Sequence, residues 1–428
     1  MPRDSIIRRM DATEGRSPRV VADDLFRREG ARAVATLAAH LGTHRLQLAE
    51  DVVQEAMVRA LQTWPYHGIP ENPGAWLNRT ARNLALDALR REQNWLRKEE
   101  RISIEQEQWL TQGGPADEPA ITDDTLRMLF VCFHPQLSIE AQLALALRTV
   151  CGLSPAEIGA AFLTTEAAIA KRLVRARQLI RDLRLPFAVP DAGELPQRLE
   201  GVLAALYLLF NEGYKASSGE HLIRSELCHE AIRLARLLPT HPATSRPECQ
   251  ALLALICLNA ARLPARMNEA GEIVRLQHQE RSHWDAGLIE EGILALGAAT
   301  TGDVVTPYHL EAGIAACHCL APDEDATDWS RILDLYDALL LVKPHPIVAM
   351  NRCVAVERRH GAAAALQNLE NIPDRKSLEK QHLFHAIRAS LLANLGRETE
   401  ARAAYRQAAD LAPCATERDF LMSMAAAS

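Results

Sequence analysis

Residues 73–91 read Pro73-Gly-Ala-Trp-Leu-Asn-Arg-Thr-Ala-Arg-Asn-Leu-Ala-Leu-Asp-Ala-Leu-Arg-Arg91. At about 100° per residue, the apolar side chains of this stretch fall on one stripe of a helix. The stripe consists of Leu77, Ala81, Leu84, Ala85 and Ala88. Asn72 and Pro73 supply an N-cap and a first-turn proline, two features that start helices. We therefore predict an amphipathic helix from Pro73 to about Lys98.

The other side of this predicted helix places a large aromatic ring among polar and cationic groups. These residues are Trp76, Arg79, Thr80, Asn83, Asp87 and Arg90. A tryptophan near a helix start commonly covers the core. An exposed ring beside cations is also what stacks on unpaired bases. Both interpretations of Trp76 fit the sequence.

A second amphipathic helix precedes the first. Between Glu50 and Trp64, apolar residues recur at helical spacing: Val53, Met57, Ala60 and Trp64. Asp51, Gln54 and Glu55 fall on the opposite side. We expect the helix to stop at a loop that runs from Pro65 to Pro73. One face of this helix is therefore predicted to pack, and the other to stay acidic.

A helix-turn-helix pattern lies further along the chain. Ser154-Pro-Ala-Glu157 is a capping box with proline at the first helical position. Thr164-Thr165 provides the N-cap of a second helix, predicted to reach about Leu183. Ile169, Leu173, Ala176 and Ile180 face inward, and Ala168, Lys171, Arg172 and Arg175 face outward. This geometry suits a DNA major groove, although a helical hairpin with a solvated charged face gives the same pattern.

Charge is distributed unevenly along the chain. The net charge is −7, yet residues 76–98 hold six Lys/Arg against two acids, as do residues 166–184. Residues 99–124 between them hold eight acids and one Arg, with Gly113-Gly-Pro115 and Pro119 interrupting regular structure. A phosphate responds to local charge rather than to the whole-chain sum. We predict an acidic linker over residues 99–122.

Residues 187–428 show helical hairpins with traces of a repeat. Ala401, Tyr405, Ala408 and Pro413 have the second-helix spacing of a tetratricopeptide repeat, and Ile332, Tyr336, Leu339 and Pro344 repeat those offsets. Gly361 and Gly396 lie 35 residues apart, close to the period of about 34 residues in such repeats. The alternative is an unrelated helical bundle.

Composition favours an all-α protein of several domains. Hydrophobic residues make up 48% of the 428 residues and aromatic residues 5%. Residues 1–10 lack the apolar core of a signal peptide, and no stretch has the length of a membrane span. We expect a cytoplasmic protein without membrane contact. The nine cysteines form no CxxC pair, and the spacing Cys317-His318-Cys319 fits packing better than zinc binding. We expect no cofactor and no metal.

Together these motifs resemble the extracytoplasmic-function sigma factors. Two stretches look like region two of that family: Asp51-Val-Val-Gln-Glu-Ala-Met-Val-Arg-Ala60 and residues 73–91. A later pair of stretches looks like region four: Gly152-Leu-Ser-Pro-Ala-Glu-Ile-Gly159, followed by Ala170-Lys-Arg-Leu-Val-Arg-Ala-Arg177. The resemblance implies two small helical sigma domains, at residues 18–98 and 123–186, without catalytic residues. The turn Phe162-Leu-Thr-Thr165 departs from the broad family because it lacks glycine.

The resemblance also implies partners, namely core RNA polymerase and promoter DNA. The side with Asp51, Gln54 and Glu55 is similar to the surface that docks on a coiled coil of the largest polymerase subunit. Trp76, Arg79, Asn83 and Arg90, with the loop 66–72, would capture the unstacked minus-ten strand. Glu166, Ala168, Lys171, Arg172 and Arg175 would enter the major groove of the minus-thirty-five element. The acidic linker looks like the segment that threads the RNA exit path, and a disordered tether is the alternative.

The remaining residues, 187–428, resemble the subgroup with a tetratricopeptide-like C-terminal extension. The resemblance rests on Leu208-Leu-Phe-Asn-Glu-Gly-Tyr214, Trp284-Asp-Ala-Gly-Leu-Ile-Glu-Glu-Gly292 and Asp328-Trp-Ser-Arg-Ile-Leu-Asp-Leu-Tyr-Asp-Ala338. We hypothesise that the extension contacts the sigma domains and governs their access to polymerase. Two other functions stay open. One is a DNA-binding regulator with an interaction scaffold that does not act as a sigma subunit. The other is an enzyme using His283, Trp284, Asp285 and Glu290, for which the sequence shows no nucleophile and base.

Overall fold

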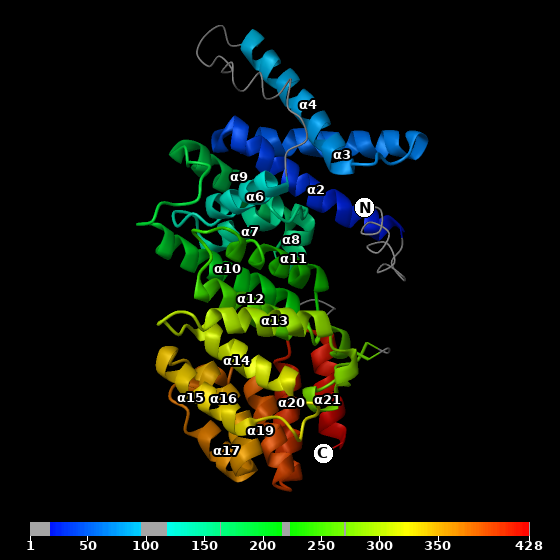
Figure 1. Ribbon diagram of the computed structural model, residues 1–428. Helices are drawn as coiled ribbons and strands as arrows, with labels where there is room; N and C mark the ends of the chain where they lie inside the picture. The colour runs from blue at the N-terminus through cyan, green and yellow to red at the C-terminus, as the bar shows by residue number, and fades with distance from the viewer. Residues whose placement is uncertain (1–17, 96–117, 163, 216–222, 269–270, 428) are drawn as a thin grey trace. The chain divides into compact units, whose positions relative to one another are not determined.

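The computed structural model describes residues 18–95, 118–162, 164–215, 223–268 and 271–427 (Figure 1). These residues are predominantly helical, and the only β-structure among them is an isolated bridge between Met267 and Ile273. The all-α prediction is therefore confirmed. The chain divides into two compact units, residues 1–160 with 164–202, and residues 161–163 with 203–428.

The first unit is built around α2 (Pro18–Leu41). This helix packs against α3 (Leu46–His67), α4 (Pro73–Trp95) and α6 (Glu118–Cys132) (Figure 1). The other elements are the 3-10 helix η1 (Thr43–Arg45), α7 (Ile139–Thr149), α8 (Pro155–Ala161), α9 (Glu166–Leu183) and the start of α10 (Leu195–Tyr214). Because α9 also packs on η1 and α7, the described parts of both predicted sigma domains lie in one unit.

Two helix boundaries differ from those expected, because proline is tolerated near helix ends. Helix α3 continues past Pro65 to His67, and Gly68, at φ +79°, ends it in a left-handed conformation that favours glycine. Helix α6 begins at Glu118, inside the predicted linker, with Pro119 in its first turn, where no backbone N–H is required. Residues 99–117 of that linker lie outside the described residues.

The second unit is a succession of helices, many of which pack against the next helix along the chain. After the second half of α10 come α11 (Ser225–Ala235), α12 (Pro247–Ala260), α13 (Ala286–Ala299), α14 (Pro307–Leu320), α15 (Trp329–Val342), α16 (Pro346–His360), α17 (Ala362–Glu370), α18 (Arg375–Leu378), α19 (His382–Asn394), α20 (Glu398–Asp410) and α21 (Ala415–Ala427). Short 3-10 helices η2 (Leu238–Thr240), η3 (Leu263–Ala265), η4 (Leu276–His278) and η5 (Arg281–His283) join some of them.

Helices that follow one another in this unit pack on one another. Helix α12 contacts α13 and α14, α15 lies between α14 and α16, and α19 and α20 form a tight pair (Figure 1). Helix α16 ends at Gly361, which has a φ of +85°. Gly396, with a φ of +72°, lies in the turn after α19. The predicted hairpins are present, and Ala401, Tyr405 and Ala408 are buried as their spacing requires. Their assignment to a tetratricopeptide repeat stays a prediction.

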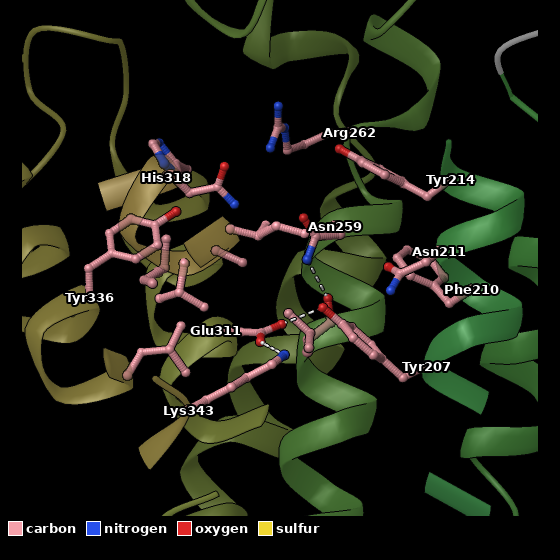
Figure 2. Close-up of a pocket in the computed structure, with 17 residues that line it drawn as sticks. Tyr207, Phe210, Asn211, Tyr214, Asn259, Arg262, Glu311, His318, Tyr336 and Lys343 are labelled. Atoms are coloured by element: carbon pink, nitrogen blue, oxygen red, sulfur yellow. Dashed lines mark hydrogen bonds and ion pairs between the residues drawn. The ribbon is translucent and has the colours of Figure 1, made fainter. Parts of the chain in front are cut away.

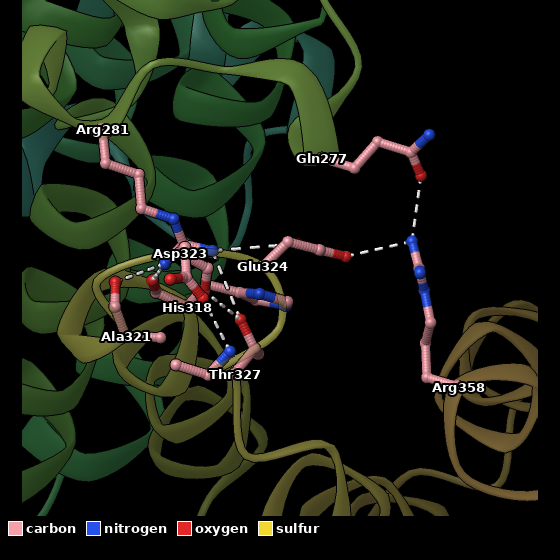
Figure 3. A network of polar contacts seen from close by, with 9 residues as sticks. Gln277, Arg281, His318, Ala321, Asp323, Glu324, Thr327 and Arg358 are labelled. Carbon is pink, nitrogen blue, oxygen red and sulfur yellow. Dashed lines mark hydrogen bonds and ion pairs between the residues drawn. The ribbon is translucent and has the colours of Figure 1, made fainter.

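An arginine fixes the loop between α14 and α15. Arg281 donates hydrogen bonds to the carbonyl oxygens of His318 and Ala321, the latter at 2.6 Å. It also lies 3.7 Å from a carboxylate oxygen of Glu324, whose other oxygen is 3.0 Å from the guanidinium of Arg358 (Figure 3). A single carboxylate thus joins two arginines from separate elements, so the loop has a defined shape.

Three of the residues considered for zinc binding or catalysis are engaged in packing and capping. Cys319 donates from Sγ to the carbonyl of Leu258 at 3.4 Å. Asp285 caps α13 by accepting from the backbone N–H of Leu288 at 3.0 Å, and Trp284 is buried. Over the described ranges, no group of three or more His, Cys, Asp or Glu side chains is placed to hold a metal. None of the described helices is long and apolar enough to cross a membrane.

Candidate nucleic-acid interface

Helix α3 presents the acidic face that the sequence predicts. Its other side is buried through Val52, Val53, Ala56, Ala60 and Trp64. Asp51, Gln54 and Glu55 are all exposed. Asp51 accepts a hydrogen bond from the side-chain amide of Gln47 at 2.8 Å, and Glu55 pairs with Arg59 at 3.2 Å. Their charges remain at the surface, where a partner could reach them.

Two apolar side chains on the same face were missed by the sequence analysis. Val58 is 46% exposed and Leu61 62% exposed. At helical spacing they continue the line of Asp51 and Gln54. A face that combines exposed aliphatic groups with carboxylates resembles the mixed core and rim of protein interfaces. The signal was available in the sequence, because neither residue belongs to the inward stripe.

The start of α4 is fixed by the predicted cap. The side-chain oxygen of Asn72 accepts from the backbone N–H of Ala75 at 2.9 Å. The predicted stripe is buried at Leu77, Ala81, Leu84 and Ala85, and half-buried at Ala88. On the other side Arg79, Asn83 and Arg90 are exposed. The helix thus shows cations and an amide to solvent along one side.

The position of Trp76 is compatible with both interpretations that the sequence left open. Its ring is half-buried and meets the ring of Trp64 edge to face, with centroids 5.5 Å apart. Part of Trp76 therefore packs, and part stays accessible beside Arg79. Tyr66, which the sequence places in the preceding loop, lies in the last turn of α3 and is 86% exposed. A second ring is thus available for stacking at this end of the helix pair.

Helices α8 and α9 begin at the caps that the sequence predicts, and their assignment to a helix-turn-helix stays a prediction. The backbone N–H of Ser154 donates to the Glu157 carboxylate at 2.7 Å, and the Glu157 N–H donates to Ser154 Oγ at 3.2 Å. Thr165 Oγ1 accepts from the N–H of Ala168 at 3.2 Å and starts α9. All four inward residues, Ile169, Leu173, Ala176 and Ile180, are buried. The reciprocal capping box explains why α8 begins at Pro155.

The turn between α8 and α9 contains no glycine. Gly159, about one helical turn before it in α8, supplies the space that this turn needs. The carbonyl of Gly159 accepts from the backbone N–H of Thr164 at 2.9 Å. A Cβ at position 159 would lie 2.8 Å from the carbonyl oxygen of Thr164 and 3.3 Å from the nitrogen of Glu166. The chain therefore crosses α8 at a distance that only glycine allows. This contact sets where α9 begins.

The outward residues of α9 surround a hollow. Ala168, Lys171, Arg172 and Arg175 line it together with Gln136 and Ser138, and its volume is about 470 Å³. Glu166, Lys171 and Arg175 are exposed, and Ala168 and Arg172 are half-buried. Ser138 is the N-cap of α7 and accepts from the N–H of Ala141 at 3.4 Å. Basic side chains beside a helix N-terminus suit a phosphate group. The contribution of α7 was not foreseen.

A buried carboxylate joins α3 to α7 and α9. Glu50 is 5% exposed and accepts a hydrogen bond from Thr149 Oγ1 at 2.7 Å. It also forms an ion pair with Arg177, whose side chain is 11% exposed. Nearby, Thr43 Oγ1 donates to the carbonyl of Leu185 at 2.5 Å. The helices carrying the acidic face and the basic face are therefore connected by polar contacts inside the first unit.

The comparisons with known proteins agree with this architecture. Residues 26–95, which span most of α2, α3 and α4, match Sigma-70 region 2. Residues 198–300 match a family of unknown function, DUF6596. The uncharacterized protein R00370 of Rhizobium meliloti (strain 1021) is 40% identical over 379 residues, which are 88% of this chain and 89% of that protein. The chain therefore belongs to one family with that protein, and its residues 26–95 are similar to region 2 of the sigma-70 transcription initiation factors.

Proposed function

We propose that this chain is an extracytoplasmic-function sigma factor that directs core RNA polymerase to specific promoters. The observation that carries the proposal is the exposed face of α3 inside the part that matches Sigma-70 region 2. Asp51, Gln54 and Glu55 supply negative charge, and Val58 and Leu61 supply apolar contact area. A basic coiled-coil partner is complementary to such a face.

The DNA-facing residues are assigned by the same proposal. Trp76, Arg79, Asn83 and Arg90 would hold the unpaired minus-ten strand, with Tyr66 as a further stacking ring. Stacking contributes about 1–3 kcal/mol per base. Glu166, Ala168, Lys171, Arg172 and Arg175 would meet the minus-thirty-five element, where arginine can read guanine and phosphate contacts fix the position. Two recognition elements on one chain explain the two separate basic stretches.

Reversing one charge on α3 tests whether its acidic face binds core RNA polymerase. We expect Asp51→Arg to weaken binding to purified core RNA polymerase at least tenfold, about 1.4 kcal/mol, because it places like charge against a basic partner. Equilibrium binding of labelled chain to core enzyme measures this. Glu200→Arg is the control, since Glu200 is also exposed in the first unit and makes the same change of charge.

This assay distinguishes the proposed sigma factor from a DNA-binding regulator that does not act as a sigma subunit. A DNA-binding regulator that does not act as a sigma subunit would bind promoter DNA without core polymerase, and Asp51→Arg would leave its activity unchanged. Equal effects of Asp51→Arg and Glu200→Arg would also count against the proposed docking face. Run-off transcription from a library of random promoters with purified core enzyme then defines the sequences that are recognised.

The helical extension is proposed to control how the first unit engages polymerase. Truncation after Val202 keeps the residues of the first unit, whereas truncation after Pro186, the expected boundary, would remove Leu195 and Leu199 from its core. We expect the chain of residues 1–202 to differ at least fivefold from the full chain in promoter-specific run-off transcription. Its melting temperature serves as the folding control. If the folded chain of residues 1–202 showed unchanged promoter-specific transcription, the proposal that the extension regulates the first unit would be excluded.

A further inference from the structure

A polar cavity lies inside the second unit, between α10, α12, α14, α15 and α16 (Figure 2). Its volume is about 330 Å³, near the lower end of the range of about 300–1,000 Å³ for small-molecule sites. Tyrosine rings and asparagine amides form much of its wall: Tyr207, Tyr214, Tyr336, Asn211, Asn259 and Asn351. This lining offers flat apolar surfaces together with hydrogen-bond donors and acceptors.

One end of the cavity has its charges matched. The carboxylate of Glu311 accepts a hydrogen bond from the Tyr207 hydroxyl at 2.5 Å and lies 3.3 Å from Lys343 Nζ (Figure 2). Burial, and after it the charge of Glu311, raises the pKa of Tyr207, so its hydroxyl keeps the proton. Because Lys343 balances Glu311, this end presents no net charge to a ligand.

The other end holds a cation whose charge is not matched. Figure 2 shows Arg262 away from the Glu311 group, beside His318. Within the part of the chain that the structure describes, Arg262 forms no ion pair, and its Nε has no hydrogen-bond partner. Its guanidinium lies 5.5 Å from the ring centroid of Trp284. A partly buried guanidinium of this kind is costly unless an acceptor satisfies it.

His318 provides the second group without a partner. It is 9% exposed, lines the cavity, and its Nδ1 has no hydrogen-bond partner among the described residues. Burial, followed by the charges of Arg262 and Arg281, lowers the pKa of His318 to about 4. The imidazole is therefore neutral near pH 7. Arg281 itself is occupied by the loop contacts shown in Figure 3, so Arg262 and His318 are the groups at this end of the cavity that a ligand could bond.

We propose that this cavity binds a small organic carboxylate, with its acid group on Arg262 and its body against the tyrosine rings. The guanidinium fork fits two carboxylate oxygens, and neutral His318 adds one further hydrogen bond. Arg262, Lys343 and Glu311 together leave one positive charge, which a monoanion neutralises. A phosphate dianion would leave excess negative charge in a partly buried site. Asn211 and Asn259 can bond polar groups on the body of the ligand.

The binding can be measured on the full chain, and its outcome does not depend on whether the chain acts as a sigma factor. The probes are a panel of aromatic and aliphatic monocarboxylic acids, each paired with its neutral primary amide, and inorganic phosphate as a separate arm. A ligand that binds only the folded chain raises its melting temperature. We expect at least one acid to raise the melting temperature of the chain. In calorimetry this acid should bind with a dissociation constant below about 1 mM. Its neutral amide should neither raise the melting temperature nor bind in this range.

Two variants locate the binding. Arg262→Gln is expected to weaken the acid at least tenfold, and Arg359→Gln, which changes an exposed arginine on α16, is the matched control with unchanged affinity. Asn259→Asp places a carboxylate in the cavity without changing the size of the side chain, and should also weaken the acid at least tenfold. This second variant keeps the test decisive if Arg262→Gln lowers stability.

Several outcomes would overturn the proposal. These are no binding by any acid of the panel, equal binding of acid and amide, binding of phosphate alone, and affinity unchanged in both Arg262→Gln and Asn259→Asp. Acids that bind the wild-type chain and the Arg359→Gln control equally, but not the two cavity variants, would establish the site.

Discussion

Arg177→Met is expected to lower the free energy of unfolding of the first unit by about 3–5 kcal/mol, because it removes the guanidinium that forms an ion pair with the buried carboxylate of Glu50. Glu50 is 5% exposed and keeps the hydrogen bond from Thr149 Oγ1 in this variant. Methionine preserves most of the apolar contacts of the arginine stem. The measurement is chemical denaturation followed by circular dichroism, with the midpoint assigned to the first unit.

Two further variants separate the loss of charge pairing from the loss of packing. Arg59→Met removes the arginine of an ion pair with Glu55 in which both side chains are about half exposed, and should change stability by less than about 1 kcal/mol. Glu50→Gln combined with Arg177→Met removes both charges, while the amide oxygen of the introduced glutamine can still accept from Thr149 Oγ1. We expect the double variant to recover most of the loss. An Arg177→Met chain as stable as Arg59→Met would show that the pair of Glu50 and Arg177 contributes little to stability.

Gly159→Ala is expected to displace the start of α9 and to weaken its proposed contacts with the minus-thirty-five element. The added Cβ would lie 2.8 Å from the carbonyl oxygen of Thr164, a backbone atom that cannot rotate away. Overpacking of this kind costs about 1–3 kcal/mol. Because Lys171 and Arg175 would move with the helix, we expect at least tenfold weaker binding of the polymerase complex to promoters that depend on this element.

Gly201→Ala is the matched control for this prediction. Gly201 also lies within a helix of the first unit, and a Cβ there would meet no atom within 4 Å. Alanine should leave stability unchanged or raise it by about 0.5–1 kcal/mol. Binding of Gly159→Ala to core polymerase alone should stay normal, since the proposed docking face lies on α3. Normal promoter binding by Gly159→Ala would refute the role given to this glycine.

Local signals in the sequence predicted the elements that carry the candidate interfaces. The Asn72 cap, the Ser154–Glu157 capping box and the Thr165 cap each act over three residues, so spacing alone located them. The buried stripes of α3, α4 and α9 followed from helical periodicity in the same way. Pro65 and Pro119 were misleading, because the cost of proline depends on whether it sits inside a helix or near its end.

Long-range contacts could not be predicted from these patterns. Glu50 and Arg177 are far apart in sequence, and nothing near either residue indicates that they meet. The same holds for Arg262, His318 and Glu311, which come together only because helices of the second unit pack side by side. Trp76 shows the intermediate case, since its position was predicted, but its half-burial depends on Trp64 from another helix.

The Glu50 carboxylate also affects how fast the first unit could rearrange. In the proposed role α4 and α9 reach two DNA elements at separate places on a duplex, and we expect α3 and α9 to move apart when promoter and polymerase are engaged. Parting them exposes an acid and a base that water then hydrates, and the transition state loses their attraction before hydration is complete. Separation is therefore expected to be slow and to depend little on salt, because a buried ion pair is screened weakly, so the pair would act as a kinetic latch.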